Sequence, residues 1–169
     1  ALYISTDNGF TWIEKSLGIV NPYIYSISIN STGNIFVGTS DHLHDYGNVF
    51  KSTDNGVTWL TILSNIFPVS AISTNGPKVY VGTNATLDTA RIYRSLDNGL
   101  TWSILYSCLH YYYVSSIAIA SNGVVYAGIP NIAIPGNGFG IIVSTDGGET
   151  WVQKNTGLTD LNVSSIAIN

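Results

Sequence analysis

The sequence predicts an all-β protein built from repeated four-stranded antiparallel units, and two observations carry that prediction. First, an eight-residue motif ending in Trp occurs four times, at residues 5–12, 52–59, 95–102 and 144–151, so the repeat has a period of 43 to 49 residues. Second, apolar residues between the motifs alternate with polar ones or form short β-branched runs, and none follow helical spacing. A period of this length is typical of solenoids, propellers and arrays.

One period contains four expected strands, at residues 70–73, 78–82, 92–95 and 101–105, with a turn at Asn75–Gly76 and the motif between the last two strands. Four antiparallel strands per period are typical of a β-propeller blade. A second element repeats in phase, as "YSISINSTGNIFVGTS", "SAISTNGPKVYVGTN" and "SSIAIASNGVVYAGI", and "SSIAIN" begins a further copy. The expected blades are residues 1–16 (partial), 23–64, 69–107, 113–155 and 163–169 (partial).

The chain therefore holds about 3.7 blades, from a third strand at residues 2–5 to a first strand at residues 163–169. Three arrangements stay open: an internal stretch of a larger propeller, copies joined edge to edge, and a self-closed four-blade ring. A ring closed by these ends would lack the second strand of its composite blade. Open propeller edges leave unpaired strands and apolar faces, which favour association.

The repeated motif has the chemistry of a turn. Its Asp accepts hydrogen bonds from nearby backbone N–H groups, its Gly adopts a conformation that a Cβ resists, and its Trp offers an apolar plate to fill the gap between blades. A catalytic Asp is needed once, whereas a structural device is needed in every blade. An EF-hand-like calcium loop also needs further acidic ligands. We therefore interpret as structural Ser5, Asp7, Gly9, Trp12, Ser52, Asp54, Gly56, Trp59, Ser95, Asp97, Gly99, Trp102, Ser144, Asp146, Gly148 and Trp151.

These motifs resemble Asp-box (BNR) repeats, which occur in sialidases, two-domain xyloglucanases, sortilin-type receptors and photosystem II assembly factors. The resemblance covers essentially the whole chain, in four copies. It implies a propeller in which the Asp box is the hairpin between the third and fourth strands of each blade. It implies no single activity, because these families differ in function.

The composition excludes several classes of function. Six Lys and Arg against ten Asp and Glu give a formal net charge of −4, without the basic patch that nucleic-acid binding requires. One Cys permits neither an internal disulfide nor a cysteine zinc site. No apolar run approaches the about 18 residues of a membrane span. We expect no cofactor and no metal.

Irregular loops lie between the second and third strands and between successive blades, and we expect them on the face opposite the motifs, where a ligand would bind. Two imidazoles in "DHLHDY" offer a metal pair, but a solvated polar loop is the favoured interpretation. For "HYYY" and for the two Arg, packing and structural roles are favoured over sugar stacking and anion binding. The candidate ligand residues are Asp41, His42, His44, Asp45, Tyr46, Asp88, Arg91, His110 and Tyr112.

Catalysis is disfavoured by the residues present. Two Arg cannot form the three-arginine cluster that the resemblance to sialidases implies. Outside the four motif Asp, the acidic residues show no spacing that marks a glycosidase pair; they are Glu14, Asp41, Asp45, Asp88, Glu149 and Asp160. The sequence thus predicts a non-catalytic binding or scaffold propeller for a protein or glycan, located outside the cell, on its surface or in the periplasm. The alternative is a fragment of a polysaccharide-active glycoside hydrolase.

Overall fold

A computed structural model of the chain describes residues 1–19, 23–41, 46–84, 89–108, 112–131, 133 and 137–168. These residues form fourteen β-strands and no helix, so the described part also has no helix long and apolar enough to cross a membrane. The expected antiparallel all-β architecture is confirmed.

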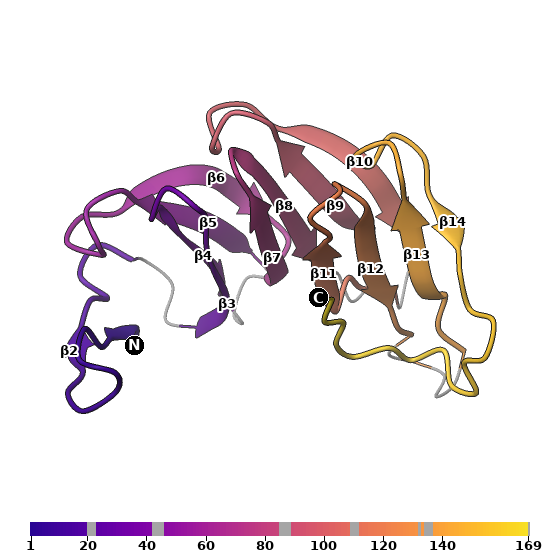
Figure 1. The fold of residues 1–169 in the computed structure, drawn as a ribbon, viewed down its shortest axis with the longest axis horizontal. Helices are drawn as coiled ribbons and strands as arrows, with labels where there is room; N and C mark the ends of the chain where they lie inside the picture. The colour runs from indigo at the N-terminus through magenta and orange to yellow at the C-terminus, as the bar shows by residue number, and fades with distance from the viewer. Residues whose placement is uncertain are drawn as a thin grey trace.

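Twelve of the strands form three four-stranded antiparallel sheets, and each sheet contains four consecutive strands in chain order. Figure 1 shows the three sheets side by side in an arc, which makes each one a blade. The first blade is β3 (Tyr23–Ile29), β4 (Ile35–Ser40), β5 (Gly47–Ser52) and β6 (Leu60–Ile66). The second is β7 (Val69–Asn75), β8 (Lys78–Thr83), β9 (Ala90–Ser95) and β10 (Ser103–Cys108), and the third is β11 (Ser116–Ile119), β12 (Val125–Ile129), β13 (Gly140–Ser144) and β14 (Val152–Gln153).

The two ends of the chain carry incomplete elements. A two-stranded hairpin, β1 (Tyr3–Ile4) with β2 (Ile13–Glu14), lies next to the first blade at the left of Figure 1. The expected final strand at residues 163–169 is not formed over residues 163–168, which pair with no described strand. Residues 163–168 instead run back beside β11, where Ser115 Oγ donates to the carbonyl of Val163 at 2.6 Å. The position of a first strand is occupied, but its ladder is missing because no second strand lies beside it in the described residues.

Glycine in the second strand of each blade lets the next blade approach closely. A Cβ on Gly38 would overlap with Val69, and a Cβ on Gly82 would overlap with Val114. In the third blade a Cβ on Gly128 would crowd the carbonyl of Val163. Each of these Val residues begins a segment that lies where the next blade starts. The repeated "VGT"-like stretch is therefore part of the interface between blades, where glycine leaves room for the Val of the following segment.

The hydrophobic core lies between the blades, as stacks of buried side chains from facing sheets. Phe36 and Val49 of the first blade pack with Val69 and Val79 of the second, and Trp102 lies against this cluster. A larger cluster joins the second and third blades, and a smaller one joins the β1–β2 hairpin to the first blade. Neighbouring blades thus bury one another, and every blade depends on the one beside it.

The turns sort onto two faces. On one face Asn30, in the β3–β4 turn, donates from Nδ2 to the Gly76 carbonyl at 3.2 Å and to Asn98 Oδ1 of an Asp box at 3.0 Å. On the other face Asn84 N donates to Pro68 O at 2.8 Å, which joins the end of β8 to the connection between two blades. The boxes and the irregular loops therefore occupy opposite ends of the blades.

Candidate functional site

Each Asp box is a closed network of local hydrogen bonds. In the second box, Ser52 Oγ donates to Asp54 Oδ1 at 2.8 Å and accepts from Gly56 N at 2.8 Å. The same carboxylate accepts from Thr58 N at 2.9 Å and from the Thr58 hydroxyl. The other three boxes repeat this arrangement around Asp7, Asp97 and Asp146. The residue after each Asp, Asn55 in this box, has a positive φ of 57° and completes the turn.

These bonds hold the box carboxylates in the ionised state. The Thr58 side chain first, then its backbone N–H and the Ser52 hydroxyl, lower the pKa of Asp54 to about 2. The equivalent donors lower the pKa of Asp7 and of Asp97 to about 2. The pKa of Asp146 is also lowered, with the Thr150 hydroxyl as the largest cause. Both oxygens of each carboxylate serve the turn, so none is available as a general acid near neutral pH.

The box Trp joins its blade to the preceding one. The indole N–H of Trp59 donates to the carbonyl of Lys15, just after β2, at 2.9 Å, and that of Trp102 donates to Ile62 of β6 at 3.0 Å. The ring of Trp151 lies 6.1 Å from that of Tyr106, tilted by 60°. Trp12 is the exception, 62% exposed, because no strand lies on its outer side among the described residues.

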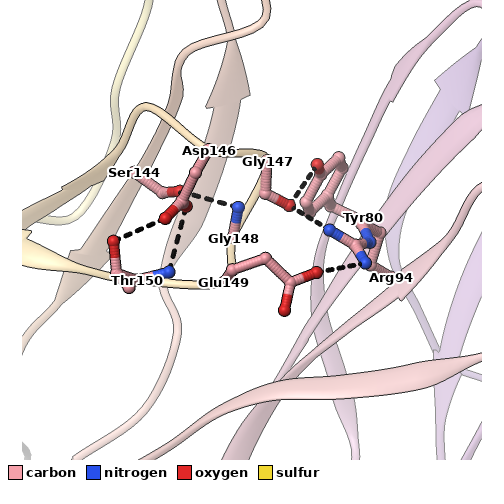
Figure 2. A network of polar contacts seen from close by, with 8 residues as sticks. All are labelled: Tyr80, Arg94, Ser144, Asp146, Gly147, Gly148, Glu149 and Thr150. Carbon is pink, nitrogen blue, oxygen red and sulfur yellow. Dashed lines mark hydrogen bonds and ion pairs between the residues drawn. The ribbon is translucent and has the colours of Figure 1, made fainter.

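A basic residue directly before the box Ser makes a second contact between blades, shown in Figure 2. Arg94 Nη1 donates to the Gly147 carbonyl of the next box at 2.7 Å, and Nη2 forms an ion pair with Glu149 Oε1 at 2.7 Å. The Tyr80 hydroxyl donates to the same carbonyl at 2.8 Å. Between the first two blades, Lys51 Nζ donates to the equivalent carbonyl, that of Asn98, at 3.0 Å.

Sequence reasoning missed this cationic contact. The signal was present, because a basic residue precedes the box Ser in two of four copies, at Lys51 and Arg94. The acceptor carbonyl lies 47 or 53 residues further on, and no spacing rule links it to the donor.

The loop face contains the described candidates for ligand binding. Asp41 and Tyr46 form an isolated bridge in which Asp41 N donates to Tyr46 O at 2.6 Å, and the Tyr46 ring is half exposed. The other candidates fall outside the described residues; they are His42, His44, Asp45, Asp88 and His110.

Two side-chain pairs that contain aromatic rings lie on this face, each at a connection between successive blades. The Tyr112 ring meets that of Phe139 edge to face, with centroids 4.7 Å apart, and both are partly buried. The Arg91 guanidinium lies 5.8 Å from the centroid of the Phe67 ring. Each pair joins the connection between two blades to the loop or strand start of the later blade, so this face offers aromatic surface backed by the core.

The described residues contain no group of three or more His, Cys, Asp or Glu side chains that could hold a metal ion. Cys108 is buried, and burial raises the pKa of its thiol to about 11, which keeps it from acting as a nucleophile near neutral pH.

Comparisons with known proteins find similar folds, of which three are described here. A model of the BNR/Asp-box repeat matches residues 142–153. A search of curated proteins finds no match. Among solved structures, an ancestral GH74 enzyme is 20% identical with a TM-score of 0.67, over 91% of this chain and 22% of its own. A variant of the NanB sialidase from Streptococcus pneumoniae is 15% identical with a TM-score of 0.59, over 90% and 27%.

The third structure, YCF48 bound to a D1 peptide, is 19% identical with a TM-score of 0.56, over 85% of this chain and 43% of its own. The chain thus spans less than half of each of these three proteins. At these identities the similarities concern the fold.

Proposed function

We infer that this chain, which is an Asp-box β-propeller segment, works as a non-catalytic binding module that presents its loop face to a glycan or a protein outside the cell. The observation that carries the proposal is that the Asp-box carboxylates act as hydrogen-bond acceptors within their own turns. All four box Asp side chains are committed to their own turns, and the described loop face offers aromatic and cationic groups instead.

Aromatic rings on a rigid scaffold suit both classes of ligand. The face of an aromatic ring packs against the apolar side of a sugar or against a peptide side chain. On the loop face, Tyr112 and Phe139 are held by the core and lose little conformational freedom on binding. The similarity to a sialidase supports a glycan ligand, and the similarity to a propeller with a bound peptide supports a peptide. An extracellular location is supported by the same sialidase and GH74 similarities.

A second candidate function is a segment of a polysaccharide-active glycoside hydrolase. It is favoured by the similarity to the GH74 enzyme and the sialidase, of which this chain covers about a quarter. In that case the catalytic carboxylates of the active protein lie on loops such as those of Asp41 and of Asp88, which belong to two different blades, or outside this sequence.

Binding to a glycan array and to a peptide library tests the first candidate. We expect binding that is weakened by Tyr112→Ala and by Arg91→Ala, and unchanged by Leu100→Ala, which alters an exposed apolar side chain on the box face. Thermal melting of each variant checks that it is folded.

A polysaccharide hydrolysis screen separates the two candidates. The binding module leaves every polymer intact. Cleavage that is abolished by Asp41→Asn or Asp88→Asn overturns the non-catalytic proposal in favour of the hydrolase.

A further inference from the structure

Two neighbouring contacts between blades differ by one charged residue. Lys51 and Arg94 each stand directly before a box Ser. Each donates to the carbonyl of the residue that follows the Asp of the next box, at 3.0 Å and 2.7 Å respectively. Arg94 also forms an ion pair with Glu149 Oε1 at 2.7 Å, as Figure 2 shows. The residue equivalent to Glu149 in the preceding box is Leu100, so the contact at Lys51 has the cation without the carboxylate.

The Lys51 ammonium keeps donors for a further acceptor. It has three N–H groups, and one of them is used by the carbonyl of Asn98. Its Nζ also lies 5.9 Å from the centroid of the Phe36 ring. No carboxylate lies within ion-pair distance of Lys51 in the part of the chain that the structure describes. The cation therefore has the capacity to bind an anion that no described residue supplies.

An open pocket lies beside this cation, and we call it the rim pocket. It has a volume of about 330 Å³ and is lined by Lys51, Thr53, Thr58, Trp59 and Leu60. Lys51 and Leu60 are directly paired between β5 and β6, so their side chains lie on the same face of the sheet. Lys51 reaches the second blade from that face, so the rim pocket lies on the side of the hairpin that faces the second blade.

The lining joins the cation to an apolar wall. The Leu60 side chain is 65% exposed, and Trp59 is partly buried. The indole N–H of Trp59 is committed to the carbonyl of Lys15, so the Trp ring contributes apolar surface. The Thr58 hydroxyl donates to Asp54 and keeps lone pairs that can accept from a ligand. A ligand that matches this lining has a negative group next to an apolar one.

The ionised box carboxylates nearby do not prevent such an ion pair. Lys51 lies next to the box of Asp54 and contacts that of Asp97, and Arg94 has an Asp at both equivalent positions. Arg94 nevertheless binds a carboxylate, that of Glu149, at 2.7 Å. Each box carboxylate accepts several hydrogen bonds from its own turn, and these donors offset its charge locally.

We propose that the rim pocket binds the carboxylate of a small apolar acid, of the size of one N-acylated amino acid. The ligand carboxylate takes the place at Lys51 that the Glu149 carboxylate takes at Arg94, and the apolar group lies against Leu60. A pocket of about 330 Å³ is at the lower end of the volumes that small-molecule sites have. Because the ion pair is open to solvent, we expect a dissociation constant of about 1 mM. The rim pocket lies at the boxes, so this site is independent of the ligand proposed for the loop face.

Titration of the protein with N-acetyl-L-leucine, followed through the NMR shifts of the backbone amides, tests the site. We expect saturable shifts that centre on Lys51, Thr58 and Leu60. N-acetyl-L-leucinamide has the same apolar group without the negative charge, and it should bind at least about tenfold more weakly. Acetate has the charge without the larger apolar group and should also bind more weakly than N-acetyl-L-leucine.

Substitution of Leu100 supplies the missing carboxylate from the protein itself. Leu100→Glu recreates at Lys51 the ion pair that Arg94 makes with Glu149, and it should weaken the binding of N-acetyl-L-leucine by about tenfold or more. Leu100→Gln introduces a side chain of the same size without the charge, so this variant should bind as the unmodified protein does. Leu100 is 78% exposed, so we expect both variants to fold, and thermal melting checks this.

Substitution of the cation gives a second test. Lys51→Gln should remove binding, and Lys51→Arg should keep it. Lys154→Gln removes the same charge from an exposed side chain just after β14 and is the control. Where Lys51→Gln fails to fold, the comparison of the two Leu100 variants still decides.

Three outcomes overturn the proposal. One is the absence of saturable shifts up to about 10 mM N-acetyl-L-leucine, roughly ten times the expected dissociation constant. Another is equal binding of the acid and its amide. The third is a folded Leu100→Glu variant that binds as tightly as Leu100→Gln. These tests report on the boxes and on β5 and β6, so their failure leaves the loop-face proposal untouched.

Discussion

Arg94 of β9 donates to the carbonyl oxygen of Gly147, 2.7 Å away in the Asp box of the following blade. The donor and acceptor belong to different repeats, and the same contact occurs between Lys51 and Asn98 one blade earlier. A cation on the third strand therefore fixes the position of the next box. Such contacts between blades add to the stability that the strand ladder of each blade provides.

Replacing Arg94 with Ala should lower the free energy of unfolding by about 1–3 kcal/mol, because a mostly buried charged donor to a carbonyl is lost. Glu149→Ala should cost less than about 1 kcal/mol, because that carboxylate is 61% exposed and its ion pair is screened by solvent. Urea denaturation of the two variants measures the difference. An equal loss in both would assign the effect to the ion pair and not to the carbonyl contact.

Acid should destabilise the fold through the box carboxylates. Their pKa is lowered from 3.8 to about 2 in Asp7, Asp54 and Asp97, so the stability they contribute is present above about pH 3.8 and is lost as the pH falls towards 2. The free energy of unfolding should fall across this window when it is measured from pH 5 to pH 2 in steps of about half a pH unit.

Asp54→Asn should lower stability at neutral pH and reduce the steepness of the acid transition. Glu14→Gln removes the same charge from a side chain outside the boxes and is the control. A variant Asp54→Asn with unchanged neutral stability and an unchanged acid slope would contradict the structural role of the box carboxylate.

Gly82→Ala should cost about 3 kcal/mol or prevent folding, because the added methyl overlaps with Val114 of the next blade. Gly33→Ala is the control for backbone strain alone. Gly33 has a φ of 80° with no atom near its Cβ position, so its replacement should cost only about 1 kcal/mol. Thermal melting of both variants tests whether contact between blades, and not turn conformation, sets the larger cost.

Trp102→Ala should be strongly destabilising, by about 3–5 kcal/mol, because the ring packs in the cluster between the first two blades. Trp102→Phe keeps most of that packing and loses the hydrogen bond to Ile62, so about 1 kcal/mol is expected. Trp12→Ala should change stability much less, because the Trp12 side chain is 62% exposed. Equal losses at the two Trp positions would contradict this division.

The sequence predicted the β-propeller architecture correctly because its signals are local and repeated. The box recurs in phase with alternating strands, and the turn chemistry of Ser, Asp and Gly is contained within eight residues. Fold similarity to known propellers agrees with that prediction. The opposite placement of boxes and irregular loops also follows from strand alternation alone.

Contacts between blades could not be predicted in the same way. The partner of Arg94 lies in another repeat, and the close approach at Gly82 depends on how two sheets stack. The prediction of a strand at residues 163–169 was wrong over residues 163–168 for a related reason. Its residues repeat those that lead into β11, but a strand also needs a neighbouring strand with which to form a ladder, and none of the described residues pairs with residues 163–168.

The self-contained bonding of the Asp boxes has a consequence for folding kinetics. In the second box every side-chain bond to Ser52 or Asp54 joins residues at most four positions apart. Loops this short close with little entropic cost, whereas these contacts between blades join residues 40 and 44 positions apart. We therefore expect the hairpins to form early and independently, as four separate nuclei, and docking of the blades to limit the rate. Pulse-labelled amide exchange should protect the box amides before those of the inner strands.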